Sequence, residues 1–369
     1  MRVGRVPLHR FSRIRPRCGS PRCRVRTHSG RKVIAVDKKI LLTGGGGYIG
    51  SVLTRKLLAD GFRVVVVDRF FFGRDTLPAA GTDLTLIGKD VRRLTRADLD
   101  GVDCVIDLAA ISNDPAGELD PQLTMDINLH ARVRCARLAR DAGVGRYILP
   151  SSSSVYGQQD GLLAESAVIK PRTTYAAANA DAEAGVLALT GDGFTVVAVR
   201  QATVFGASPR MRLDLVVHQM VIQAVRRGVI PVLGDGRQWR PFVHIADVAD
   251  AMVTLIGAPA DLITGQRFNL GGNDLNYRIV ELAEIIGRET NVDRFAPYPG
   301  LDDRSHRMDF TKIENTLGFV PSRTVADGVR EVIDGLETGR IDENDPRGFT
   351  VPWYERLLSA GGPDSPAVY

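Results

Sequence analysis

Three glycines at a strand-to-helix junction constrain this chain more than any other feature. Gly44, Gly47 and Gly50 recur every third residue, between an apolar run at residues 40–43 and a helical pattern at residues 48–59. In such a turn the first glycine permits a tight bend, the second lets the backbone approach a pyrophosphate, and the third lets the helix pack closely on a sheet. The unpaired N–H groups and the dipole at the helix N-terminus also favour phosphates. The spacing therefore predicts a dinucleotide-binding unit.

The strand that follows this helix separates the prediction from a merely flexible glycine loop. Residues 64–67 are four consecutive valines, which suits a parallel strand buried on both faces. Asp68 ends this strand, 18 residues after Gly50. An acidic side chain in that position accepts hydrogen bonds from the adenosine ribose and repels a 2′-phosphate. The pattern therefore favours NAD over NADP as the cofactor.

Strand-like apolar runs alternate with helical segments along most of the chain. Such an alternation is typical of a doubly wound parallel sheet, so we expect an α/β protein with a Rossmann fold. The further expected strands are residues 84–87, 104–108, 147–149 and 195–199, and the further expected helices are residues 121–142 and 174–189.

Basic residues gather at the start of the chain. The formal net charge is +5, but residues 1–36 carry eleven Lys and Arg and no Asp or Glu, which leaves a net charge of −6 for the rest. An acidic body argues against nucleic acid as the main partner. Residues 1–36 are expected to be disordered, because like-charged blocks rarely fold. Three interpretations stay open: a basic arm, an organellar transit peptide, or translated sequence upstream of a misplaced start.

Composition also limits the compartment and the chemistry. No apolar run approaches the roughly 20 residues of a membrane helix, and no hydrophobic signal-peptide core is present. Four cysteines are too few for a disulfide framework, and Cys104 and Cys135 lie in apolar segments. The spacing of Cys18 and Cys23 matches no standard zinc pattern. We therefore expect a cytoplasmic protein with no metal, no nucleic-acid partner and no membrane partner.

Ordered motifs resemble those of the NAD-dependent epimerase/dehydratase family, a branch of the extended short-chain dehydrogenases/reductases. The resemblance starts with TGGGGYIG at residues 43–50, continues through DINLHA and SSSSVYG, and reaches DDRSHRMDFTKIENTLGFVP at residues 302–321. It spans about residues 33–335. It implies a two-lobed enzyme, with an NAD-binding Rossmann domain and a smaller C-terminal α/β lobe that binds the substrate. The expected Rossmann domain comprises residues 37–205 with 241–265 returning to it, and the expected substrate lobe comprises residues 206–240 and 266–369.

The resemblance also implies which residues contact NAD. Beside the glycine turn, Asp90 resembles the residue that contacts adenine, and the strand end at residues 108–110 resembles the one beside the cofactor. Asn128 matches the usual helix asparagine. The aromatic run at residues 70–72 follows Asp68 and is interpreted as a cover for the adenine ring. The full expected set is Gly44, Gly47, Tyr48, Ile49, Gly50, Asp68, Asp90, Val91, Leu108, Ala109, Ala110, Asn128 and Tyr175.

The expected catalytic groups are Ser152, Tyr175 and Asn179. Tyr175 matches the tyrosine that takes the hydroxyl proton of a sugar while NAD takes a hydride, and Ser152 matches the hydroxyl that orients the reacting oxygen. A free tyrosine has a pKa of about 10, and the family lowers it with a lysine four residues later. This chain has Asn179 there, and no lysine between residues 171 and 199. Three outcomes follow: an enzyme with a retuned base, a slow enzyme, or a protein that binds NAD without turnover.

The branch of the family is narrowed by the residues after Ser152. The 4,6-dehydratases carry Asp and Glu in the next two positions, whereas this chain has Ser153 and Ser154. The resemblance therefore favours a nucleotide-sugar epimerase that recycles its NAD within each turnover. The alternatives are an NAD-dependent nucleotide-sugar dehydrogenase or ketoreductase, and a non-catalytic NAD-binding protein.

Most of the residues expected to bind the substrate are arginines. Arg240 and Arg304 match family positions that clamp the pyrophosphate of a nucleotide-diphosphate sugar, and Arg210 and Arg212 lie on a nearby loop. Thr203 replaces a common asparagine in the strand that frames the sugar. His244 and Asp247 are interpreted as structural links between the lobes.

Two further expectations concern helices. The arginine-rich stretch at residues 132–140 is interpreted as a solvated helix face. By resemblance alone, this helix and the one that bears Tyr175 form a homodimer interface.

Overall fold

A parallel sheet forms the centre of the protein. The structure, a computed structural model, describes residues 38–298 and 305–360. Within these residues seven strands pair in the order β11-β7-β5-β4-β1-β2-β3, and every neighbouring pair is parallel. The predicted doubly wound α/β fold is therefore confirmed. The strands are β1 (Lys39–Thr43), β2 (Arg63–Asp68), β3 (Leu84–Gly88), β4 (Cys104–Asp107), β5 (Arg146–Ser152), β7 (Thr195–Gln201) and β11 (Gln266–Leu270).

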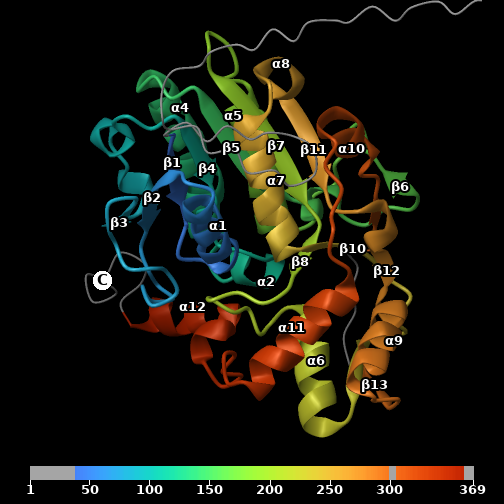
Figure 1. Cartoon of the computed structure of the whole chain (residues 1–369). Coiled ribbons are helices and arrows are strands. Elements are labelled where there is room, and N and C mark those ends of the chain that lie inside the picture. The colour runs from blue at the N-terminus through green and yellow to red at the C-terminus, as the bar shows by residue number, and fades with distance from the viewer. Residues whose placement is uncertain (1–37, 299–304, 361–369) are drawn as a thin grey trace, which may run out of the picture. The chain divides into compact units, whose positions relative to one another are not determined.

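Helices cover both faces of this sheet (Figure 1). The helices α1 (Tyr48–Ala59) and α7 (Ile245–Gly257) pack side by side in front of it in this view, over a core that includes Leu53 and Met252. The helices α4 (Arg132–Asp141) and α5 (Thr174–Leu187) pack on the opposite face, where Cys135 is completely buried. Burial on both faces explains the continuous apolar runs of the strands.

The helix expected at residues 121–142 is interrupted. The structure has α3 (Pro121–Met125), then a π-helical turn at Asp126–Ala131, and then α4. A π-turn shifts the register of a helix and commonly occurs near functional sites. Here it contains Asn128, whose side chain pairs with the backbone N–H and C=O of Ile111 at 2.9 Å each. The interruption thus fixes the loop that follows β4.

A second layer packs below the carboxyl end of the main sheet. Its core joins α6 (Val216–Arg227), α9 (Ile279–Thr290) and α11 (Val325–Glu337). Short strands accompany these helices: β8 (Thr203–Phe205), β10 (Trp239–His244) and β12 (Asn276–Arg278) in one sheet, and β9 (Ile230–Leu233) with β13 (Phe295–Tyr298) in another. The remaining elements are β6 (Leu162–Leu163), β14 (Arg307–Met308), α2 (Asp114–Gly117), α8 (Ala260–Ile263), α10 (Thr311–Leu317), α12 (Thr350–Ser359) and six 3₁₀ or π turns within the described residues.

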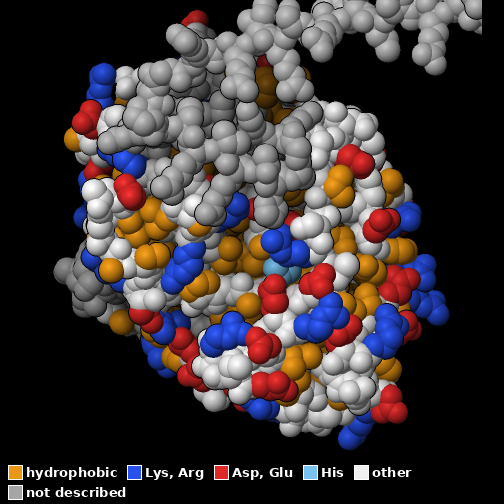
Figure 2. Space-filling model, viewed as in Figure 1, with side chains coloured by type: hydrophobic (Ala, Val, Ile, Leu, Met, Phe, Trp, Pro, Cys, Tyr) orange, Lys and Arg blue, Asp and Glu red, His pale blue; other side chains and the backbone are white. Residues whose placement is uncertain are grey.

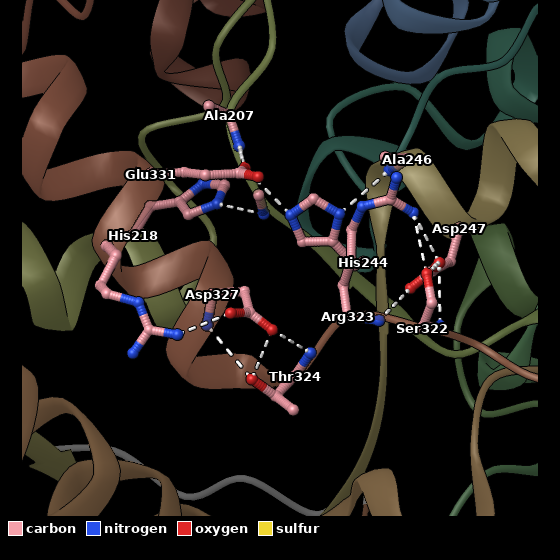
Figure 3. Close-up of polar contacts among 12 residues, drawn as sticks. Ala207, His218, His244, Ala246, Asp247, Ser322, Arg323, Thr324, Asp327 and Glu331 are labelled. Atoms are coloured by element: carbon pink, nitrogen blue, oxygen red, sulfur yellow. Dashed lines mark hydrogen bonds and ion pairs between the residues drawn. The ribbon is translucent and has the colours of Figure 1, made fainter.

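His244 and Asp247 connect β10 and α7 to the segment around α11 (Figure 3). The His244 ring lies 3.0 Å from Glu331 through its Nε2 atom, and its Nδ1 atom accepts from the N–H of Ala246. The Asp247 carboxylate accepts from the backbone of Ser322 and pairs with Arg323 at 2.7 Å. These contacts agree with the structural role that the sequence indicated.

The extent of the main sheet differs in one place from the boundary expected between the two lobes. β11 pairs with β7 in the main sheet, so this sheet extends to Leu270, beyond the boundary expected at residue 265. Phe268 and Leu270 are fully buried in its core, which holds the strand there. The rest of the division into lobes stays a prediction, and residues 1–36 lie outside the described residues.

The surface seen in Figure 2 carries both signs of charge. Acidic and basic side chains are interspersed over α6, α9 and α11, with apolar side chains between them. Among the described residues, no helix combines the length and the apolar character that a membrane crossing requires.

Candidate active site

The glycine turn between β1 and α1 makes a close approach to the strand beside it. Gly44 has φ +66°, and a Cβ atom there would lie 2.7 Å from the backbone nitrogen of Ala109. A Cβ atom on Gly50 would lie 2.5 Å from the carbonyl oxygen of Gly44. Gly47 precedes α1 and provides no side-chain cap. The N–H groups of the first turn are therefore available to an anion, as the spacing predicts.

Asp68 ends β2 beside this turn. Its Oδ2 atom accepts from the N–H of Gly46 at 2.9 Å, and its Oδ1 atom accepts from the N–H of Phe70 at 2.7 Å. Burial raises the pKa of this carboxyl, while the two backbone hydrogen bonds and the charge of Arg210 act to lower it. The side chain is thus locked at the end of the strand, where it lines a cavity.

A cavity of about 220 Å³ opens over the turn and the carboxyl ends of β1, β2 and β4. This place, where the strand order reverses, is where doubly wound sheets bind their ligands. Eleven of the residues expected to contact NAD line it: Gly44, Gly47, Tyr48, Ile49, Gly50, Asp68, Asp90, Val91, Leu108, Ala109 and Ala110. The glycine cradle and the acidic end of β2 fit a dinucleotide.

The other two residues expected to contact NAD, Asn128 and Tyr175, lie outside the lining of this cavity. Asn128 is fully buried and holds Ile111, which does line the cavity. Its position is therefore one layer behind the wall. Tyr175 lies on α5, and α2 packs against it: a Cβ atom on Gly117 would lie 2.9 Å from the Cβ of Tyr175.

The C-terminal helix α12 closes one side of the cavity. Its residues Tyr354, Leu357 and Leu358 join Phe71 and Phe72 in the lining. The Trp353 indole donates to the carbonyl of Phe71 at 2.9 Å. The aromatic run after β2 is thus held against the cavity by the C-terminus of the described chain.

Two of the arginines assigned to the substrate line the same cavity as the expected NAD contacts. Arg210 is 4% exposed and stacks over the Phe72 ring at 3.6 Å, and its Nε atom has no hydrogen-bond partner in the described part of the chain. Burial lowers the pKa of Arg210 to about 10. Arg212 pairs with Asp214 at 2.8 Å. The buried guanidinium group of Arg210 at this cavity favours an anionic ligand.

The other expected substrate residues lie elsewhere. Arg240 is buried on β10, where it pairs in register with Tyr277 of β12, and it does not line the cavity. Thr203 begins β8 and is half-buried. Arg304 lies outside the described residues.

The expected catalytic pair is brought together. Ser152 ends β5, and its hydroxyl lies close enough to the Tyr175 phenol to act on its pKa. Burial raises the pKa of the Tyr175 phenol and the Ser152 hydroxyl lowers it. The Asp114 carboxylate raises this pKa, and the charges of Arg132 and Arg212 lower it. The net direction is upward, so in this state the phenol is a weaker acid than free tyrosine.

Asn179 is 1% exposed and its amide is engaged on both sides. Its Nδ2 atom donates to the carbonyl of Tyr175 at 2.8 Å, and its Oδ1 atom accepts from Nη1 of Arg132 at 2.7 Å. The predicted contact of Asn179 with a ribose stays a prediction. The interpretation of residues 132–140 as a solvated face is wrong for Arg132, which is 3% exposed. Arg134, Arg137 and Arg140 are exposed as expected.

Sequence reasoning missed three contributors to this region. Arg132 carried a detectable signal, since Cys135, Ala136 and Ala139 follow it at helical spacing on one apolar face. No sequence pattern indicates Asp114, because it lies on a helix of only four residues. Its carboxylate accepts a hydrogen bond from the Thr173 hydroxyl at 2.6 Å. The docking of α12 depends on contacts far apart in the chain, and short-range patterns do not reveal such contacts.

Comparison with known proteins agrees with this architecture. The model of the NAD dependent epimerase/dehydratase family matches residues 40–271. The chain is 28% identical over 339 residues to UDP-glucuronic acid decarboxylase 1 of Arabidopsis thaliana, covering 87% of this chain and 75% of that protein. It is 28% identical over 329 residues to the uncharacterized UDP-glucose epimerase YtcB of Bacillus subtilis, covering 81% and 98%. The structure of MoeE5 in complex with UDP-glucuronic acid and NAD is similar, with a TM-score of 0.72, 29% identity, and coverage of 82% and 99%.

Proposed function

The chain belongs to the NAD-dependent epimerase/dehydratase family of enzymes, and from this premise we propose that it is an NAD-dependent epimerase of a nucleotide-diphosphate sugar. The observation that carries the proposal is the position of Ser152, at the end of β5, close enough to the Tyr175 phenol to lower its pKa, next to a cavity formed by a glycine turn and Asp68. Such a site combines a place for NAD with a hydroxyl pair that can handle one proton.

The residues present support a proton-handling role for Tyr175. When bound, NAD⁺ would supply a hydride acceptor for a sugar carbon and would give the hydride back within the same turnover. In its ionised form, Tyr175 Oη accepts the proton of the sugar hydroxyl as that carbon becomes a ketone. The Ser152 hydroxyl donates a hydrogen bond to the same sugar oxygen and holds it in place. When the ketone is reduced from its other face, Tyr175 returns the proton, so the net change is inversion of one carbon.

The residues after Ser152 favour this reaction over elimination of water. Ser153 and Ser154 occupy the positions where a dehydratase carries its acid and base, and a hydroxyl is a much weaker acid or base than a carboxyl group near pH 7. Asp114 supplies one carboxylate near Ser154, at 3.4 Å, but it also accepts from Thr173. A single engaged carboxylate does not make an acid–base pair.

The substrate class rests on charge and on the relatives. Arg210 offers a buried cation to phosphate groups, and planar guanidinium groups bind phosphate through two parallel hydrogen bonds. Arg212 lies beside it but already pairs with Asp214. The similar proteins named above act on or bind UDP-sugars, according to their names, which makes a uridine nucleotide the first candidate. Arg240 and Arg304 stay predicted clamps of the same diphosphate. The cytoplasmic location and the homodimer stay predictions.

One experiment separates the proposed function from its alternatives. The purified protein with NAD is incubated with UDP-glucose, UDP-galactose, UDP-glucuronic acid and the matching dTDP-, GDP- and CDP-sugars. Chromatography follows the sugars, and absorbance follows NADH. A new isomer of the same mass without accumulated NADH supports the epimerase, whereas loss of carbon dioxide indicates a decarboxylase. Accumulated NADH with an oxidised sugar indicates a dehydrogenase. Bound NAD with no product across the panel indicates a protein that binds NAD without turnover.

A further inference from the structure

Arg132 places a buried positive charge next to the helix turn that carries Tyr175. The residue is the first of α4 and is 3% exposed. In the described part of the chain its guanidinium donates to two neutral oxygens, the carbonyl of Ala109 at 3.3 Å and Oδ1 of Asn179 at 2.7 Å. Neither contact neutralises it, and arginine stays protonated at any physiological pH. Burying a cation destabilises the fold unless the charge interacts favourably with a neighbouring group.

The contacts of Arg132 join the cofactor cavity to the tyrosine. Ala109 lines the cavity, and Asn179 in turn donates to the carbonyl of Tyr175 at 2.8 Å. The amide of Asn179 is oriented by these bonds, because its oxygen must face the arginine and its nitrogen must face the preceding turn. The contacts therefore run from Ala109 through Arg132 and Asn179 to the backbone of Tyr175, one helix turn before Asn179.

We propose that Arg132 supplies, from α4, the positive charge that stabilises the ionised form of Tyr175, and that Asn179 serves to hold this arginine in position. The proposal rests on the proposed function for its purpose, since a stable phenolate is needed to take the sugar proton. Arg132 is a positioning residue in this scheme, because it acts on Tyr175 and touches no reacting atom. In this scheme, the positive charge that the family carries at the position of Asn179 is supplied by Arg132 on α4.

The positive charge of Arg132 acts on the pKa of the Tyr175 phenol in the direction that the proposal requires. Burial, the largest influence, raises the pKa of Tyr175 and sets its net direction, and the charge of Arg132 acts against it. The other groups that face this region from neighbouring elements are Ser152 at the end of β5, Asp114 and Glu118 around α2, Arg212 in the loop after β8, Asp107 at the end of β4, and Glu183 on α5. Glu183 is paired with Arg200 at 2.8 Å, and the hydroxyl groups of Thr43 and Tyr147 bind Asp107. Both carboxylates are therefore engaged by partners other than the Arg132 guanidinium.

The test uses two variants at one position that differ in charge. Arg132→Lys keeps a cation and Arg132→Gln keeps a hydrogen-bond donor without charge. Tyrosine labelled with carbon-13 at the ring carbon that bears the hydroxyl reports ionisation by NMR, and the Tyr175→Phe variant assigns the Tyr175 signal among the eight tyrosines. A nearby opposite charge lowers the pKa of a tyrosine, because it favours the ionised phenolate. We expect the Tyr175 titration of the NAD-loaded Gln variant to move up by about 1–2 pH units, and that of the Lys variant to stay within about half a unit of the wild type.

Equal titration midpoints in the Lys and Gln variants would overturn the proposal. Arg137→Gln is the matched control, because Arg137 lies exposed on the same helix, and its midpoint is expected to equal that of the wild type. If the Gln variant does not fold, the double variant Arg132→Met/Asn179→Lys returns one cation to the same place. Its Tyr175 midpoint is expected at or below that of the wild type, and a midpoint a full unit higher would also overturn the proposal. The titration needs no sugar substrate, so its failure is distinct from failure of the epimerase assay.

Discussion

The Trp353 indole donates a 2.9 Å hydrogen bond to the carbonyl of Phe71, a residue 282 positions earlier in the chain. Trp353 belongs to α12 and Phe71 to the loop after Asp68, so this bond ties the C-terminal helix to the wall of the cofactor cavity. Arg347 reinforces the connection, because it donates to the carbonyl of Phe72 at 3.0 Å and pairs with Asp75 at 2.9 Å. The helix therefore closes the cavity from a distant part of the sequence.

Loosening this closure is expected to shorten the time that NAD stays bound. Trp353→Phe removes one hydrogen bond, which contributes about 1 kcal/mol, so NAD release should accelerate about fivefold. Stopped-flow displacement of bound NADH, followed by its fluorescence, measures the rate. Glu355→Gln, an exposed change on the same helix, serves as the control and should leave the rate unchanged. An unchanged rate in Trp353→Phe would show that α12 does not retain the cofactor.

Removing the phenol of Tyr175 separates binding from chemistry. Tyr175→Phe should lower turnover by about 10³-fold, because a positioned proton acceptor contributes about 10²–10⁴-fold. NAD affinity should change little, since Tyr175 does not line the cavity. Isothermal titration and the sugar assay measure the two quantities on the same sample. Full turnover without the phenol would rule out Tyr175 as the base.

Placing a lysine at position 179 is expected to destabilise the fold. Asn179→Lys would place a second cation against Arg132 in a buried site, and an uncompensated buried charge destabilises a fold by about 3 kcal/mol. We expect a lower free energy of unfolding and no gain in turnover. The double variant Arg132→Met/Asn179→Lys should recover most of the stability, and urea denaturation measures both. A stable single variant with much higher turnover would contradict the relocated charge.

His218 gives the protein a pH-dependent stability. Its Nε2 atom accepts from the N–H of Gly206 at 3.1 Å, and its Nδ1 atom lies 2.6 Å from the carbonyl of Arg212, so only the neutral ring satisfies both contacts. Burial lowers the pKa of His218 to about 4 from the ordinary 6.5. Between these values the unfolded chain binds the extra proton, so stability falls as the pH falls below about 6.5.

The expected size of this effect is about 2 kcal/mol between pH 7 and pH 5, at 1.36 kcal/mol per pH unit. His218→Gln keeps a donor and an acceptor but cannot titrate, so its loss of stability over the same range should be smaller by that amount. Denaturation at the two pH values measures the difference. The exposed His130→Gln variant controls for removal of a histidine. Identical pH dependence in His218→Gln and the wild type would contradict a neutral buried ring.

Local patterns predicted the parts of the fold that depend on neighbours in sequence. The helix expected at residues 48–59 is α1, and the valine run at residues 64–67 lies within β2. These elements follow from spacing and from burial on both faces of a parallel sheet. The glycine turn and Asp68 predicted the place of the cofactor for the same reason, because the whole motif spans adjacent residues.

Features that depend on contacts between distant parts of the chain could not be predicted from the sequence. The sequence pattern predicts a continuous helix across the π-turn at Asp126–Ala131, because the pairing of Asn128 with Ile111 is a tertiary contact that the pattern does not reveal. The arginines of α4 have similar neighbours in sequence, but only Arg132 faces α5 and is buried. The closure by α12 joins residues that no short-range pattern relates.

The most direct test of the epimerase follows the hydrogen on the inverted carbon. The protein is incubated with NAD and its nucleotide-sugar substrate in D₂O, and NMR and mass spectrometry examine the epimer. Hydride removal and return within one turnover predicts a product whose inverted carbon keeps its original hydrogen and carries no deuterium. Deuterium on that carbon would contradict the account, because it would show inversion by exchange of a proton with the solvent.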